Sequence, residues 1–327
     1  MTDMITSKTE LCPWVGRVAW LGIGLWLIVG SGCRALRDHR QTRSLAMARQ
    51  LSLRGAGLLQ QQNYAEAAPL FSEALQYSVA DERAHWGMAE VLWEQDQREA
   101  AIEHMEQAVG LSGQNPELLV RLGEMYRQTG NLDSAARVAD EALTCDRRCH
   151  AAWSLKGDVL KERQRWNEAL DCYQRALIYH PEDAAARIAL ADLYQRLRRP
   201  QRALATLERL VDVHPTDELP AEAWILKGQC LADLGQQLEA RDCLRQAALC
   251  VDEADADLLL KLASLQLAFG ELAEARVCLG RARQHVDPHD PRLQQLQRAV
   301  ENQFASITDG SGTTVLSTGF QRPASPQ

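Results

Sequence analysis

Acidic residues recur every 34 positions through the middle of the sequence, and basic residues follow three of them at helical spacing. The acidic residues are Glu90, Glu124, Asp158 and Asp192, and the basic residues are Arg127, Lys161 and Arg196. A row of carboxylates with interleaved bases suits a basic or mixed-charge peptide segment. The same spacing also suits ion pairs within single helices, each worth about 0.2–0.5 kcal/mol. Both interpretations are open from the sequence.

No pattern indicates a catalytic centre. The glycine-containing segment 55–57 has no strand before it, as a phosphate-binding loop requires, and the eight histidines are scattered. Cys145, Cys149 and His150 lie close together in sequence, but a zinc site needs a fourth ligand and none is evident. The sequence therefore predicts a non-enzymatic protein without a resident metal or cofactor.

The cysteines do not form a complete disulfide framework. Nine are present, and removal of Cys12 and Cys33 with an N-terminal signal would leave an odd number, seven. Cys172, Cys243 and Cys278 share one position of the repeat described below, where we expect packed thiols. Abundant unpaired cysteine favours a reducing compartment and argues against export.

Composition and charge exclude several classes of protein. The chain has 327 residues, of which 46% are hydrophobic and 24% charged, too polar for a protein with many membrane spans. Its net charge of −8 argues against nucleic-acid binding driven by positive charge. The charge is uneven, because residues 34–54 hold six arginines and one aspartate. A short basic strip thus precedes a long acidic body.

The N-terminus contains an apolar run of the length found in export signals. Residues 18–29, twelve in all, have no polar side chain. They are too few for a comfortable transmembrane helix of about 20 residues, but they fit a signal peptide. Small residues then lead to Cys33, which resembles the lipobox of bacterial lipoproteins, although Gly30 stands where that motif usually has leucine. The resemblance implies cleavage before Cys33 and lipidation of that cysteine.

An uncleaved membrane anchor over residues 1–33 is the alternative interpretation. More positive charge follows the apolar run than precedes it, which would place the body in the cytoplasm. Lipidation would instead place the body in the bacterial cell envelope, facing the periplasm. In either case the basic linker, residues 34–47, could lie against anionic head groups or simply be solvated.

The body of the chain repeats every 34 residues. Five segments in register each carry alanine at the fourth position, and a glycine or alanine column lies upstream of them. Larger residues separate the small ones, and two further units follow after short insertions. The segments are 64–75, 98–109, 132–143, 166–177 and 200–211, and the upstream column is Gly55, Ala89, Gly123, Gly157 and Ala191.

This pattern resembles the tetratricopeptide repeat. The resemblance implies an all-α fold, a right-handed superhelical solenoid of about seven helix-turn-helix repeats. Gly130, Gly235 and Gly270 stand where the first helix of a unit should end. A capping helix is expected over 290–307 and a disordered tail over 308–327. The expected units are 48–81, 82–115, 116–149, 150–183, 184–217, 221–254 and 256–289.

In this family the first helix of each unit lines a concave groove that binds partners, so the resemblance places the acidic row there. Trp86 and Trp93 lie about two helical turns apart, and they could supply an aromatic anchor. The predicted partner-binding residues are Trp86, Glu90, Trp93, Glu124, Arg127, Asp158, Lys161, Asp192 and Arg196.

The function predicted from these features is a membrane-anchored scaffold that binds a protein or peptide in the groove of its repeats. It would contact the membrane through its N-terminus and would not bind nucleic acid. The alternative is an accessory subunit of an envelope assembly, secretion or biogenesis enzyme complex, which a co-purifying catalytic activity would reveal.

Overall fold

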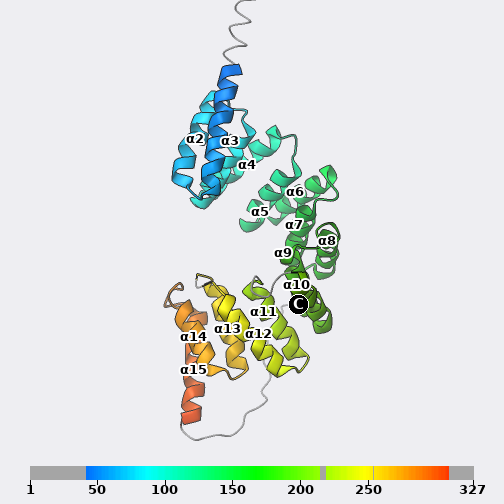
Figure 1. Cartoon of the computed structure of the whole chain (residues 1–327), viewed down its shortest axis with the longest axis vertical. Coiled ribbons are helices and arrows are strands. Elements are labelled where there is room, and N and C mark those ends of the chain that lie inside the picture. The colour runs from blue at the N-terminus through cyan, green and yellow to red at the C-terminus, as the bar shows by residue number, and fades with distance from the viewer. Residues whose placement is uncertain (1–41, 214–218, 253, 309–327) are drawn as a thin grey trace, which may run out of the picture. The chain divides into compact units, whose positions relative to one another are not determined.

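The computed structural model describes residues 42–213, 219–252 and 254–308, and every regular element in this part of the chain is a helix (Figure 1). A helix over residues 42–60 comes first and begins before the predicted boundary at residue 48. The predicted signal segment with Cys33 and the tail from residue 309 lie outside the described residues. The later helices are α2 (Tyr64–Tyr77), α3 (Glu82–Glu94), α4 (Arg98–Leu111), α5 (Pro116–Gln128), α6 (Leu132–Cys145), α7 (His150–Glu162), α8 (Trp166–Tyr179), α9 (Ala184–Arg196), α10 (Pro200–Val213), α11 (Ala221–Asp233), α12 (Gln237–Cys250), α13 (Ala256–Ala268), α14 (Leu272–Ala282) and α15 (Pro291–Thr308).

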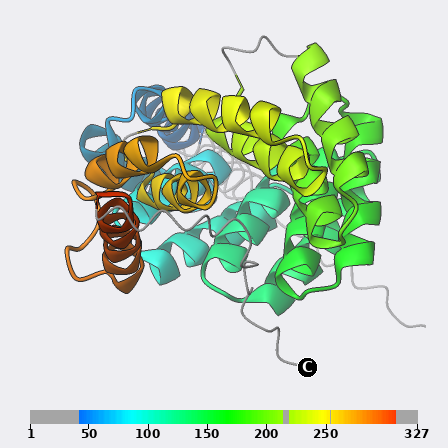
Figure 2. The ribbon, with the colours of Figure 1, turned by 90° about the horizontal axis from the view of Figure 1, so that it is seen from below.

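These helices form pairs. The chain divides into two compact units, and the division falls between Arg147 and Arg148. The first unit contains three pairs in chain order: the helix over 42–60 with α2, α3 with α4, and α5 with α6. Within the second unit, α7 to α14 form four further pairs that pack on their neighbours in chain order, a stack that Figure 2 views from below. The all-α repeat solenoid predicted from the sequence is confirmed.

Side chains at the helix ends explain where the helices begin. Asn or Asp precedes seven of the described helices, and its side-chain oxygen accepts a hydrogen bond from a backbone N–H two or three residues later. Such caps replace hydrogen bonds that a helix cannot make at its first turn. The capping residues are Asn63, Asp81, Asn115, Asn131, Asp183, Asp255 and Asp290.

The turn inside each pair needs one residue in the left-handed conformation. Gly130, Gly235 and Gly270 adopt it with φ of 80°, 83° and 73°, as their sequence positions predicted. Other pairs place a side chain at the equivalent position despite the cost of that conformation for non-glycine residues. These residues are Gln62, Asp96, Gln164 and Arg198, with φ of 57°, 61°, 60° and 59°.

The predicted small-residue columns form the core. Every alanine of the fourth-position column is fully buried, from Ala67 in the first pair to Ala275 in the last. Gln266, which replaces the usual leucine or tyrosine of its column, is also fully buried. The bulky column between the small ones fills the remaining space with side chains that are at most 4% exposed, namely Phe71, Met105, Ala139, Tyr173, Leu207, Leu244 and Leu279.

Phe71 shows why small residues are required at these helix contacts. Its ring lies against Gly55 of its own pair and Gly87 of the next pair. A Cβ atom added at Gly55 would stand 2.7 Å from Phe71 Cε1, and one added at Gly87 would overlap the ring. The absence of a side chain at these two glycines therefore lets three helices close around one aromatic ring.

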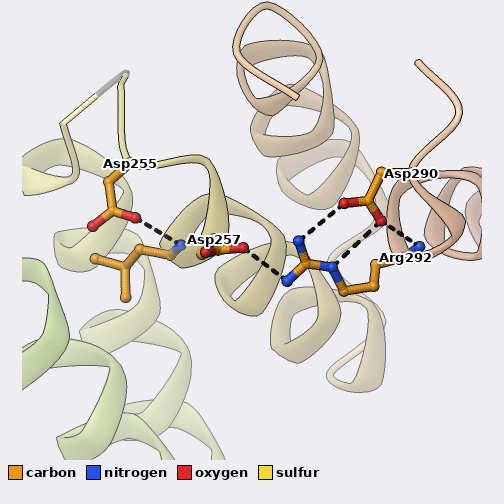
Figure 3. A network of polar contacts seen from close by, with 5 residues as sticks. Asp255, Asp257, Asp290 and Arg292 are labelled. Atoms are coloured by element: carbon orange, nitrogen blue, oxygen red, sulfur yellow. Dashed lines mark hydrogen bonds and ion pairs between the residues drawn. The ribbon is translucent and has the colours of Figure 1, made fainter. Parts of the chain in front are cut away.

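The last helix, α15, is joined to α13 through Arg292 (Figure 3). Asp290 accepts a hydrogen bond from the Arg292 backbone N–H at 2.7 Å, and its Oδ2 accepts from Arg292 Nη2 at 2.9 Å. Arg292 Nη1 donates to Asp257 Oδ1 at 2.7 Å. Hydrogen bonding to the two carboxylates raises the pKa of the Arg292 guanidinium. The helix predicted as a cap over 290–307 thus has polar contacts at its start, while Leu293 and Val300 are buried.

Replacement of Gly87 by alanine should destabilise the first unit. Alanine normally stabilises a helix interior by about 0.5–1 kcal/mol relative to glycine, but the overlap with Phe71 should outweigh that gain. We expect Gly87→Ala to lower the free energy of unfolding by about 1–3 kcal/mol, the usual cost of overpacking. Urea unfolding followed by circular dichroism measures the change.

Gly57→Ala is the matched control, because no atom of another described helix lies within 4 Å of a Cβ added there. This variant should be at least as stable as the unmodified chain. In the double variant Phe71→Leu with Gly87→Ala, the alanine should cost much less free energy of unfolding than it does in the presence of Phe71. Stabilisation by Gly87→Ala alone would contradict the proposed contact with Phe71.

Candidate partner-binding surface

Trp86 and Glu90, two of the predicted site residues, line a groove in the first unit. The groove has a volume of about 310 Å³ and lies between the helix over 42–60, α2 and α3. Trp86 is 42% exposed, and its Nε1 donates a hydrogen bond to Glu90 Oε1 at 3.1 Å. An indole held by a carboxylate thus borders a groove whose other lining residues include Ala56, Leu59, Tyr64, Phe71 and Arg83.

Trp93 does not offer the second exposed ring that the sequence predicted. It is only 6% exposed. The guanidinium of Arg98 lies 4.1 Å from the centre of its ring, and that of Arg121 lies 5.9 Å away. Little of the Trp93 ring is therefore available to a partner. Helical spacing places Trp93 on the same helix face as Trp86, but it cannot show that two arginines lie near its ring.

Arg121, which was not among the predicted residues, binds the first two acids of the row. Its Nε and Nη2 donate to the two carboxylate oxygens of Glu90 at 2.8 and 2.6 Å. Its Nη1 donates to Glu124 Oε2 at 3.3 Å. The hydrogen bonds that Arg121 donates to Glu90 are the main reason why the pKa of Arg121 is raised. These contacts join α3 to α5, so in the first unit the acidic row contributes to the contact between helix pairs.

The remaining predicted residue of the first unit, Arg127, is half-buried on α5. Neither Glu124 nor Arg127 is among the residues that line the groove beside Trp86. A signal for Arg121 was present in the sequence, since it stands three residues before Glu124 and thus on the same helix face. That spacing did not reveal its stronger contact with Glu90.

The second unit brings four predicted residues together. Asp158, Lys161, Asp192 and Arg196 line one groove of about 590 Å³. The groove is formed by α7, α9, α11 and α13, which are the first helices of consecutive pairs. Glu222 and Lys261 add one further charge of each sign, and the apolar lining residues are Ala184, Ala185, Ile188, Ala189, Pro220 and Leu226.

Hydrogen bonds fix two of the carboxylates in this groove, which we call the first-helix groove. The Tyr173 hydroxyl donates to Asp158 Oδ1 at 2.5 Å. Arg196 Nε donates to Asp192 Oδ2 at 2.9 Å, which is the intrahelical pair that the spacing predicted. The Arg196 side chain is still 53% exposed and that of Asp192 is 28% exposed. Both charges therefore remain accessible to a ligand.

The thiols are packed as predicted. Cys172, Cys243 and Cys278 are buried, and burial raises the pKa of the Cys243 and Cys278 thiols. Burial also raises the pKa of Cys230 to about 12, so this thiol stays protonated at neutral pH. In contrast to these buried thiols, Cys145 and Cys250 are exposed.

Two further findings concern only the residues that the structure describes. No group of three or more His, Cys, Asp or Glu side chains in that part of the chain is arranged to hold a metal ion. Among the same residues, no helix combines the length and apolar character that a membrane crossing needs.

Solved structures of tetratricopeptide repeat proteins share this fold. A tetratricopeptide repeat protein from Parabacteroides merdae matches 79% of this chain and all of its own, with a TM-score of 0.63 and 14% identity. PilW, described as a widely conserved type IV pilus biogenesis factor, matches 62% of this chain and 92% of its own, with a TM-score of 0.56 and 18% identity. At these identities the likeness establishes the fold alone.

Two curated human proteins also match, namely RanBP2-like and GRIP domain-containing protein 4 and protein 5/6. They are 25% and 24% identical to this chain over an alignment of 220 residues, and the match covers 61% of this chain. The match spans only 12% of the length of each human protein.

Family models identify the repeat directly. A model described as tetratricopeptide repeat matches residues 58–106, 92–159 and 160–230, and a second model of the same description matches residues 221–248. Together these matches cover more than half of the chain. The chain therefore belongs to the tetratricopeptide repeat family.

Proposed function

We propose that this protein is a non-enzymatic interaction scaffold that binds a mixed-charge segment of a partner protein in its first-helix groove. The observation that carries the proposal is the composition of that groove. Three acids and three bases, Asp158, Asp192, Glu222, Lys161, Arg196 and Lys261, surround a lining of alanine, isoleucine, leucine and proline. Such a surface can bury an apolar side chain of a ligand while it pairs charges of both signs around it.

The charges favour specificity more than affinity. Exposed ion pairs contribute roughly 0–1 kcal/mol each, so the apolar lining must supply much of the binding energy. A segment whose charges had the wrong order would bring like charges together and be rejected. The ligand that fits best is therefore a short segment with an apolar residue between an acidic and a basic one.

Trp86 supplies a second contact in the first unit. Tryptophan is enriched among the residues that dominate binding energy, because a large ring can bury much area with little loss of side-chain freedom. Its bond to Glu90 orients the ring beside the groove of about 310 Å³. We infer that Trp86 binds an apolar side chain of a partner.

The groove proposal predicts a loss of partner binding on charge reversal. Affinity purification with mass spectrometry would identify the proteins retained by the unmodified chain, and titration would then give a dissociation constant for one of them. The double variant Lys161→Glu with Arg196→Glu should weaken binding at least tenfold. Trp86→Ala should weaken it by about 2 kcal/mol, or roughly thirtyfold, if the ring dominates its contact.

Leu249→Ala is the control, because Leu249 lies on the second helix α12 and is 79% exposed. It should bind the partner as the unmodified chain does. Unchanged binding by the charge-reversed variant, with its helical content intact, would remove the first-helix groove as the binding site. A catalytic activity among the retained proteins that is lost on deletion of the repeats would favour the accessory-subunit alternative.

We also propose that the chain is a lipoprotein attached through Cys33 to the bacterial cell envelope, with its body facing the periplasm. The support is the sequence alone: the apolar run 18–29 and the small residues that lead to Cys33. The competing proposal is a single-pass anchor that keeps the body in the cytoplasm.

Labelling with radioactive palmitate distinguishes these two forms of attachment. The unmodified chain should incorporate the label, Cys33→Ala should not, and Cys12→Ala should incorporate it normally. A chain that stays in the membrane fraction without any label would contradict the lipoprotein proposal and favour the uncleaved anchor.

A further inference from the structure

A second groove of about 540 Å³ lies on the opposite set of helices in the second unit. Its walls come from α8 and α10, the second helices of consecutive pairs, and α9 lies between them. Three arginines line it, Arg187 from α9 and Arg202 and Arg209 from α10, and no acidic residue does. We call it the arginine groove. It shares no lining residue with the first-helix groove.

Arg187 is the most informative of these residues, because its charge is buried. The residue is only 8% exposed. Its Nη2 donates a hydrogen bond to the carbonyl oxygen of Pro181, but its Nε is buried and has no hydrogen-bond partner among the described residues. Leaving a buried donor unpaired is costly, and more so for a charged group. An external acceptor would remove that cost.

The charges around Arg187 also favour binding of an anion. Burial and the nearby positive charge of Arg209 lower the pKa of the Arg187 guanidinium, while Asp183 raises it. Asp183 has other contacts, because its Oδ1 accepts from the Ala186 N–H at 2.9 Å and its Oδ2 lies 3.7 Å from His150 Nδ1. A guanidinium remains charged at neutral pH. The groove thus contains repelling positive charges that a bound anion would offset.

The spacing of the arginines indicates what kind of anion fits. Arg202 and Arg209 are seven residues apart, which is about 10 Å along one face of α10. Two carboxylates three residues apart in a peptide with polyproline II conformation lie on one face and are separated by a similar distance, since that conformation has three residues per turn and spans about 3.1 Å per residue. A single phosphate would require both arginine side chains to bend toward one point, whereas two carboxylates match the separation of the arginines directly.

The apolar lining favours a peptide over a simple anion. Ile178 is 71% exposed beside the groove, and Leu177 and Leu190 also line it. Exposed apolar surface of this kind is available to a side chain of a ligand. Gln174 Nε2 donates to the Tyr194 hydroxyl at 3.0 Å, which fixes a polar pair in the same wall.

We propose that the arginine groove binds an acidic peptide segment, in which two carboxylates pair with Arg202 and Arg209, a third acceptor reaches Arg187, and an apolar side chain packs on Ile178. This site is distinct from the first-helix groove and would let the scaffold contact two partner segments of different charge. Because the peptide would be held by ion pairs with these arginines, added salt should strongly weaken its binding.

Fluorescence anisotropy with the purified full chain tests the proposal. The probe is a short, labelled synthetic peptide with two glutamates three positions apart and a leucine between them. The double variant Arg202→Gln with Arg209→Gln should bind it at least tenfold more weakly than the unmodified chain. A probe with glutamine in place of both glutamates should lose affinity to a similar extent.

Two control variants make the result specific. Arg137→Gln, on the second helix α6, removes an arginine whose side chain is 59% exposed and should leave binding unchanged. Lys161→Glu with Arg196→Glu alters only the first-helix groove and should also leave it unchanged. Circular dichroism of each variant checks that its helices are retained.

Three outcomes would overturn the inference. One is equal binding of the peptide by the unmodified chain and the Arg202→Gln/Arg209→Gln variant. Another is loss of binding only in the first-helix groove variant, which would place the acidic peptide there. The third is displacement of the labelled peptide by inorganic phosphate at the same concentration at which unlabelled peptide displaces it. That result would mean that the site recognises a single anion. Since none of these outcomes requires the partner of the first-helix groove, failure here leaves the proposed function standing.

Discussion

The close approach of neighbouring helices at small residues is the constraint on which the rest of the structure depends. A helix pair of this kind cannot bury its apolar face alone and does so only against the next pair. The buried alanines at the fourth position of each repeat allow that contact, and Phe71 between Gly55 and Gly87 shows how little space remains. Stacking therefore fixes which helix faces stay exposed and which residues lie beside one another on them.

Two exposed faces with different chemistry follow from this arrangement in the second unit. The first helices present a groove with charges of both signs, and the second helices present one lined by arginines without an acidic residue. Exposed charge pairs contribute little to stability, so the core supplies most of the folding energy. Charged residues on both faces are consequently available for recognition.

The core could be predicted from the sequence because a constant repeat places each column at one depth. The buried alanines, the packed thiols at Cys172 and Cys243, and the glycine turn at Gly130 all follow from that regularity. Arg198 shows its limit, since nothing in its residue type indicates the left-handed conformation it adopts. Arg198 stands two repeats after Gly130, and this position, rather than its residue type, accounts for the conformation.

The candidate site was less predictable, because side chains on different helices decide it. Spacing within one helix correctly paired Asp192 with Arg196, but it missed the bonds from Arg121 to Glu90 across two helices. It also could not show that arginines cover Trp93. Arg187 likewise becomes notable only once its burial is known.

The most direct test of the central claim is amide hydrogen exchange, resolved by helix, in a chain that carries Ala169→Leu. Ala169 is fully buried on α8 at the contact between helices. If close packing at this column stabilises the stack, exchange should accelerate in α7, α8 and α9, while α14 and α15 at the end of the same unit change little. Protection of α7, α8 and α9 equal to that in the unmodified chain would contradict the account.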